Sequence, residues 1–354
     1  MTLLKIRQPQ LKLLERLCAA CAVSGDEGEV RKIVLEELKP AADSVKVDVL
    51  GNVLVTKLGN AGTDRLRVML AAHMDEVGFM ITGEDGEGLY RFEIVGGIDE
   101  RQLPGKPVQV GKKHIPGVIG AKPIHLTDAG ERKNAISLDG MRIDVGPEAN
   151  KVKVGDRATF ATPLLQLGPS LRSKSLDNRL GVATLIELIR NAPANVDILA
   201  AFTVQEENGL RGAQVAAYAF NPDLAIVLDA TPANDLPLWD ASENTRYNTR
   251  LDAGPAIYVA DRGTLHDPRL VRHLMDTAEA RGIPYQIRQP GGGGTDAGII
   301  HRQRAGIPSV SVSVPHRYTH SAASLARRAD WEHTLQLIHA ALEGLSRELL
   351  TVDR

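Results

Sequence analysis

The sequence predicts an α/β fold in which a mixed sheet, sandwiched between helices, is interrupted by a small inserted β-barrel domain. Near-continuous apolar runs such as 65–72 and 196–204 alternate with amphipathic helical segments towards both ends of the chain. Such runs are typical of strands that helices cover on both faces. Between residues 76 and 162 the helical periodicity stops, and short strands separated by glycine replace it, a pattern typical of an inserted β-barrel or sandwich.

The elements follow one another in a regular order. Two helical segments and two short strand-like runs occupy 9–59, before the strand at 65–72. After the β region, the pattern predicts helices at 176–192, 209–220, 267–283 and 330–349, and strands at 196–204, 222–230 and 307–315. The polar segment 128–140 is interpreted as a loop. We therefore expect a discontinuous α/β domain, 1–75 with 163–354, and an inserted β-barrel or PDZ-like domain at 76–162.

Composition narrows the class of protein. A chain of 354 residues is long enough for one large domain with an insertion, and 43% hydrophobic with 24% charged residues is typical of a globular protein. No apolar run reaches the roughly 18 residues that a bilayer helix needs, and charges interrupt the N-terminal segment, unlike a signal peptide. We therefore expect a cytoplasmic protein without a membrane partner. A net charge of -2 and 4% aromatic residues give no reason to expect nucleic-acid binding.

Two further motifs are predicted to carry no chemistry. Cys18 and Cys21 form "CAAC" within the first predicted helix, whereas a redox pair would follow a strand at the start of a helix, so we expect reduced packing or surface cysteines. The run 290–301, "PGGGGTDAGIIH", lacks the lysine of a phosphate-binding loop. Its glycines instead let the backbone approach a neighbouring site closely.

Groups able to do chemistry gather where the predicted strands end. In open α/β sheets, sites form beyond the carboxyl ends of the strands. Taken singly, each group has a structural interpretation, such as a helix cap, a turn former or a hydrogen-bonded histidine. The strand-end groups are His73, Asp75, Glu206, Glu207, Asp229, His316 and His320, and Asp177 stands where a helix begins.

Together these groups predict a metal centre. Two imidazoles and three carboxylates drawn from this set would suit two divalent ions such as Zn²⁺, Co²⁺ or Mn²⁺. A carboxylate shared between the ions lets them approach within about 4 Å. Glu206 and Glu207 would point in different directions from an extended backbone, so one can bind metal while the other moves protons. A bound ion lowers the pKa of water from 15.7 to about 7, which makes hydroxide available. Asp75 could orient His73 through its second ring nitrogen.

The motifs resemble those of one known family. The similarity extends over nearly the whole chain to the M42 family of dinuclear-metal aminopeptidases, which includes the TET aminopeptidases and proteins named glutamyl aminopeptidase or endoglucanase M. The motifs that carry it are "AAHMDEVGFM", "SLDNRLG", "VQEENGLRGA", "VLDA", "GGGGTDAG" and "SVPHRYTHS".

The resemblance implies a role for each residue. His73, Glu207, Asp229 and His320 would be the terminal metal ligands and Asp177 the bridging ligand, with His320 rather than His316 matching the family's "YTHS" block. Glu206 would be the general base and Asp75 the residue that orients the first histidine. Asp296 would line the metal crevice without belonging to the catalytic residues. The implied reaction is the removal of N-terminal residues from short peptides by a hydroxide that bridges two Zn²⁺ or Co²⁺ ions, Mn²⁺ being a further candidate. The implied assembly is a homo-oligomer, commonly a tetrahedral dodecamer.

Other functions remain as alternatives. A glycoside hydrolase of the endoglucanase type would need two carboxyl groups about 5.5 Å or more apart on separate elements, which adjacent glutamates serve badly. A non-catalytic peptide-binding homologue would be expected to lose a ligand or the proton-moving glutamate. A carboxypeptidase or deacylase of related fold would lack the β insertion and the "YTHS" ending.

Overall fold

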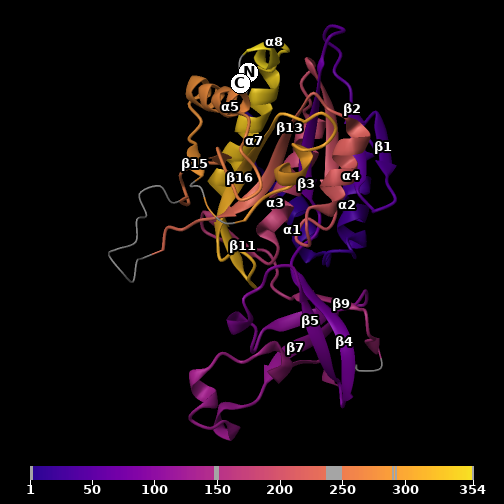
Figure 1. Ribbon diagram of the computed structural model, residues 1–354, viewed down its shortest axis with the longest axis vertical. Helices are drawn as coiled ribbons and strands as arrows, with labels where there is room; N and C mark the ends of the chain where they lie inside the picture. Colours follow the sequence, from indigo (N-terminus) through magenta and orange to yellow (C-terminus); the bar gives the residue numbers. More distant parts are fainter. Residues whose placement is uncertain (1–2, 147–150, 237–248, 289–290, 292, 353–354) are drawn as a thin grey trace.

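The computed structural model describes residues 3–146, 151–236, 249–288, 291 and 293–352. A β-barrel projects from one end of a larger α/β body (Figure 1). The combination of a mixed-sheet body and an inserted barrel confirms the predicted fold class. Among the described residues, no helix is long and apolar enough to cross a membrane.

The body is built on a mixed sheet that has eleven strands in the described parts of the chain. Along the main path the order is β1-β2-β12-β3-β13-β16-β17-β11-β10, and β14 pairs with both β15 and β16. At the centre β12, β3, β13 and β16 are parallel. The strands are β1 (Ser44–Val47), β2 (Val53–Lys57), β3 (Leu66–His73), β10 (Leu165–Leu167), β11 (Ser170–Ser173), β12 (Val196–Thr203), β13 (Leu224–Pro232), β14 (Ala256–Tyr258), β15 (Gln286–Arg288), β16 (Ser309–Arg317) and β17 (Ser324–Arg327).

Helices cover both faces of this sheet, which explains the unbroken apolar runs. Along β3, Val68 and Leu70 belong to the core on one face, whereas Met69 and Ala71 belong to the core on the other. The first core is shared with α1 (Gln8–Ala19), α2 (Gly28–Leu38), α3 (Leu176–Arg190), α5 (Pro268–Arg281) and α7 (Arg328–Glu343). The second is shared with α4 (Arg211–Phe220) and α6 (Ala297–Ile300), and a short α8 (Glu348–Thr351) lies against α5.

The insertion is a closed six-stranded barrel rather than a sandwich. Its strands are β4 (Gly78–Gly86), β5 (Leu89–Val95), β6 (Pro107–Val110), β7 (Ile115–Ala121), β8 (Met141–Asp144) and β9 (Arg157–Phe160), in the order β4-β5-β8-β7-β6-β9. Phe79 centres its core and meets Phe92 and Phe160 edge to face, with ring centroids 5.2 and 5.3 Å away. The predicted loop 128–140 holds only short 3-10 helices, Glu131–Lys133 and Leu138–Gly140.

A buried ionic cluster lies where the chain leaves the body for the barrel. Glu76 follows β3, and both of its carboxylate oxygens are 2.8 Å from Lys174 Nζ. The Arg179 guanidinium donates to the same carboxylate at 2.8 Å. All three side chains are buried, so each charge depends on the others for the interactions that water would supply.

One of the two cysteines lies outside the helix predicted for it. Helix α1 ends at Ala19 because Ala20 is extended, so Cys21 lies outside the helix that was expected to contain both cysteines. Cys18 is buried and Cys21 partly buried, and both are free thiols.

Candidate metal centre

The register of the parallel strands brings three chain segments together. His73 ends β3 and pairs with Thr203, the last residue of β12. On its other side β3 pairs with β13, where Ala71 lies opposite Val227. Two residues further along, β3 reaches His73 and β13 reaches Asp229. The adjacent carboxyl ends of three strands therefore converge, as the sequence predicted.

Asp177 faces the same place because its neighbour stabilises the start of α3. The Asn178 side-chain oxygen accepts the N–H of Gly181 at 3.0 Å, which is the capping interaction that Asp177 could have made. The Asn178 amide donates to the Leu228 carbonyl at 2.8 Å and so anchors this turn to β13. Asp177 and Asn178 have non-helical backbone angles, and the peptide bond between them is cis.

Glu206 and Glu207 lie in a turn and not in the extended backbone that was expected. Gln205 has a φ of 56°, and the Glu206 carbonyl accepts the N–H groups of Gly209 and Leu210 at 3.0 Å. The extended strand ends at Thr203, which explains the difference. Both glutamates still line one cavity together with His73, Asp177 and Asp229.

Asp75 holds this turn as well as the first histidine. Its carboxylate accepts the N–H of Glu206 at 3.0 Å, the N–H of Glu207 at 3.2 Å and the Ser24 hydroxyl at 2.6 Å. The Nδ1 atom of His73 lies 3.5 Å from the same carboxylate and 3.2 Å from the Asp75 carbonyl oxygen. Because Asp75 is fully buried, these groups replace its solvation.

Both histidines turn their Nε2 atoms towards carboxylates. The Nδ1 of His320 donates to the Gly97 carbonyl at 2.7 Å, from the loop after β5 of the barrel segment. His73 is fixed in the equivalent way by Asp75. A second ring nitrogen held by a protein acceptor is the usual arrangement for a histidine that binds metal through its other nitrogen. No sequence pattern pointed to Gly97, since it is far along the chain and contributes only backbone.

The carboxylate of Asp177 stands between the two imidazoles. Its Oδ1 is 3.2 Å from His73 Nε2, and its Oδ2 is 3.6 Å from His320 Nε2. Asp229 Oδ1 lies 3.4 Å from the same His73 atom, and Glu207 lies 3.2 Å from the same His320 atom. Ligand atoms of His73, Asp177 and Glu207 all lie within 4.8 Å of one another. This donor set fits divalent cations that accept nitrogen and oxygen ligands.

The charges of the site also indicate a place for cations. Burial by itself lowers the pKa of both histidines, but carboxylates outweigh it. Glu206 and Asp177 raise the pKa of His73 well above its ordinary value, and Asp177 and Glu207 raise the pKa of His320 to about 11. Without bound metal, protons on the imidazoles therefore provide the positive charge that the buried acids require.

The two adjacent acids that face the cavity are also shifted. Burial, together with the charges of Asp229 and Glu207, raises the pKa of Glu206 well above its ordinary value although His73 acts in the opposite sense. Burial, opposed mainly by the His320 hydrogen bond, also raises the pKa of Glu207. Buried carboxylates in this arrangement are typical of functional sites.

The residues open into a cavity of about 740 Å³. Its walls include the side chains of Arg262, Arg288 and Tyr258, together with backbone at Gly293 and Gly294. The cavity is large enough for a short peptide terminus. The glycine backbone approaches it as expected, with a φ of 85° at Gly293.

Two residues considered from sequence lie apart from the cavity wall. Asp296 does not line the cavity, contrary to expectation: it is buried, and its carboxylate accepts the Thr203 hydroxyl at 2.6 Å. Its pKa is raised to about 7, mainly by burial. His316 belongs to β16 itself and is fully buried.

The chain is similar over most of its length to proteins of one family. A model of the M42 glutamyl aminopeptidase family matches residues 51–337. The lysyl aminopeptidase of Pyrococcus furiosus is 32% identical over 94% of this chain and 97% of its own. The aminopeptidase APDkam598 from Desulfurococcus kamchatkensis superposes with a TM-score of 0.90 at 33% identity, covering 97% of this chain and 96% of that one.

A further solved structure bears on assembly. The Pyrococcus horikoshii TET1 peptidase, which can assemble into a tetrahedron or a large octahedral shell, is 34% identical with a TM-score of 0.82. The match covers 95% of this chain and 100% of that one. The family match and the full-length similarity lead to one conclusion: this chain belongs to the M42 glutamyl aminopeptidase family of metallopeptidases and is an aminopeptidase.

Proposed function

We propose that this aminopeptidase removes N-terminal residues from short peptides with the help of two divalent metal ions, Zn²⁺ or Co²⁺ in preference to Mn²⁺. The observation that carries the proposal is the position of Asp177, whose two oxygens face different imidazoles at 3.2 and 3.6 Å. A carboxylate placed in this way can bridge two cations. His73 and Asp229 would complete one ion's ligands, and Glu207 and His320 those of the other.

Divalent ions held here would supply Lewis acidity, polarising the scissile carbonyl and making water a competent nucleophile near neutral pH. Glu206 would accept a proton from the attacking water and deliver it to the nitrogen of the leaving amine. Its pKa, raised mainly by burial, suits a group that must both take and release a proton. Asp75 would keep the His73 ring and the Glu206 turn in place through its hydrogen bonds.

Two neighbouring substitutions test the division of labour. Glu206→Gln should leave both metal ions of the candidate centre bound and lower kcat by about 10²- to 10⁴-fold, the usual contribution of a general base. Glu207→Gln should instead lose metal. Metal content by mass spectrometry and hydrolysis of amino-acyl p-nitroanilides measure the two effects. Wild-type turnover in Glu206→Gln, or full metal content in Glu207→Gln, would contradict the assigned roles.

The glycoside hydrolase alternative gains no support from the cavity. Tyr258 is the one aromatic side chain among the described residues that line it, whereas sugar sites usually offer aromatic platforms. The carboxylates lie within a few ångströms of shared imidazoles and do not face each other across an open gap. Assays of p-nitroanilides and carboxymethylcellulose, each with and without chelator, would separate the two activities.

We also propose a homo-oligomer, with the tetrahedral dodecamer as the expected form. The similarity to the TET1 peptidase over almost the whole chain supports this assembly. Light scattering should give a mass near twelve times that of the 38.2 kDa chain. For the domain division we propose 1–75 with 163–354 as the catalytic domain and 76–162 as the inserted domain.

A further inference from the structure

A second cluster of metal-binding groups lies outside the candidate centre, where the helices meet the barrel. Ligand atoms of Cys21, Glu29 and His114 all lie within 4.8 Å of one another. We propose that these three residues form a separate site for a borderline divalent cation such as Zn²⁺ or Co²⁺. A thiol, an imidazole and a carboxylate together are a ligand set that such cations accept.

The three groups are already oriented towards each other. His114 Nε2 lies 2.7 Å from Glu29 Oε1, and Glu29 Oε2 accepts the Cys21 backbone N–H at 2.9 Å. Around tetrahedral zinc with bonds of about 2.0 to 2.3 Å, ligand atoms stand roughly 3.3 to 3.7 Å apart. The imidazole and the carboxylate would therefore separate by no more than about 1 Å to admit the ion.

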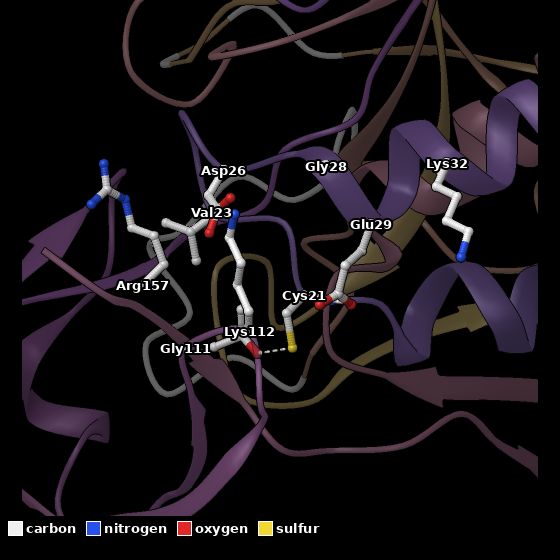
Figure 2. A pocket seen from close by; sticks show the side chains of 10 residues that line it. Cys21, Val23, Asp26, Gly28, Glu29, Lys32, Gly111, Lys112 and Arg157 are labelled. Atoms are coloured by element: carbon white, nitrogen blue, oxygen red, sulfur yellow. Dashed lines mark hydrogen bonds between the residues drawn. The ribbon is translucent and has the colours of Figure 1, made fainter. Parts of the chain in front are cut away.

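The ligands come from three separate segments. Cys21 follows α1, Glu29 lies in the first turn of α2, and His114 immediately precedes β7 of the barrel. The thiol and the carboxylate lie together at the wall of a cavity of about 310 Å³ (Figure 2). This cavity leaves room for water as the fourth ligand, the arrangement expected when a protein supplies three. It shares no lining residue with the cavity of the candidate metal centre.

An anion site is the main alternative, because Lys32, Lys112 and Arg157 also line the cavity. The two lysines are exposed, so burial does not fix their flexible ammonium groups towards a common point. The Arg157 guanidinium is engaged by the Gly155 carbonyl at 3.0 Å. The groups that do converge are metal ligands.

A simple ion pair is the other alternative. Glu29 and His114 could pair without a metal, as many partly exposed groups do. That interpretation leaves out the thiol, whose sulfur lies within 4.8 Å of both groups and contacts the Thr159 hydroxyl at 3.3 Å and the Gln109 side-chain oxygen at 3.5 Å. A bound cation would use all three groups and tie the barrel to α1 and α2.

Cobalt spectroscopy of the full-length protein tests the proposal. The candidate centre offers only nitrogen and oxygen ligands, so a sulfur-to-cobalt charge-transfer band would report on Cys21 alone. Titration of metal-free protein with Co²⁺ should produce this band, with a final intensity that corresponds to one thiolate-bound ion per chain. Cys21→Ser should abolish the band and lower the metal content by one ion while the d–d bands of the other centre persist, which also shows that the variant folds.

Two further variants keep the test decisive. His114→Asn removes the imidazole but suits the φ of 51° at this position, since asparagine tolerates the left-handed region, and it should also lose the band. Cys18→Ala is the matched control: Cys18 is the other thiol and is fully buried, and its removal should leave the band intact. The proposal is overturned if wild-type protein gives no thiolate band, if the band survives either ligand substitution, or if it disappears in Cys18→Ala.

Discussion

Replacing Asp75 by Asn tests how strongly one buried carboxylate organises the metal centre. The carboxylate accepts two backbone N–H groups, from Glu206 and Glu207, and one hydroxyl, from Ser24. Asparagine keeps one acceptor oxygen but replaces the second carboxylate oxygen by an NH₂ group. That NH₂ group would face a backbone N–H, so two donors would meet without an acceptor. The hydroxyl can rotate to accept, but a backbone N–H cannot. Losing one hydrogen bond to a buried charged group costs about 1.5 to 3 kcal/mol, so we expect unfolding to become about 2 to 3 kcal/mol easier.

The same substitution should weaken metal binding. Loss of a group that orients a ligating histidine typically costs about 10- to 100-fold in affinity, or about 1.4 to 2.7 kcal/mol. Urea unfolding of metal-free protein and competition with a chromophoric chelator measure the two effects. Ser24→Ala is the control: it removes one donor to Asp75 but keeps the charge, and should cost only about 1 kcal/mol with metal affinity near wild type. Unfolding within about 0.5 kcal/mol of wild type, together with unchanged metal affinity, in Asp75→Asn would refute the reasoning.

Three other predictions concern stability. Metal-free folded protein keeps a proton on His320 up to a pKa of about 11, whereas the unfolded chain loses it near 6.5, so this stabilisation is full below pH 6.5 and is lost as the pH rises towards 11. Urea unfolding at pH 7 to 10 should show the free energy of unfolding falling by at most about 1 kcal/mol per pH unit, after allowance for partial exposure. His320→Gln should make this fall smaller without abolishing it, because the pKa of His73 is also raised. Glu76→Gln should cost about 3 to 5 kcal/mol, because Lys174 and Arg179 would remain buried without a counter-charge; an unchanged thermal midpoint would exclude this explanation. Gly212→Ala should lower the free energy of unfolding in urea by about 1 to 3 kcal/mol, because the added Cβ would lie 2.2 Å from the Asn52 side-chain oxygen and 2.6 Å from backbone atoms of Val204. Full stability would show that the start of α4 can shift.

Much of the architecture is predictable because burial determines it. The unbroken apolar run of β3 requires cores on both faces, and the structure provides one for Val68 and another for Met69. The change to short glycine-separated strands indicated the insertion, but periodicity could not distinguish a barrel from a sandwich. Closure depends on long-range pairings such as β4 with β9, which no local pattern records.

The candidate site is predictable where strand order brings strand ends together. His73 and Asp229 are neighbours because their strands pair in parallel. The turn at Glu206 was not predictable, because it depends on where the strand stops and on hydrogen bonds to a distant carboxylate. Cys21 was assigned to the wrong element because a helix end one or two residues early leaves almost no trace in a periodic pattern. Gly97 acts through its carbonyl, and a backbone group has no signature in residue types.

That carbonyl makes the insertion part of the chemistry rather than an appendage. A catalytic body expressed without residues 76–162 would keep every acidic and imidazole side chain of the centre, yet the His320 ring would lose the acceptor that sets its angle and tautomer. Any tilt of the barrel relative to the sheet would move the Gly97 carbonyl away from the Nδ1 atom of this ring. If the insertion is exchanged for that of a homologue, the orientation of the Gly97 carbonyl therefore has to be preserved, whereas the rest of the barrel surface can vary.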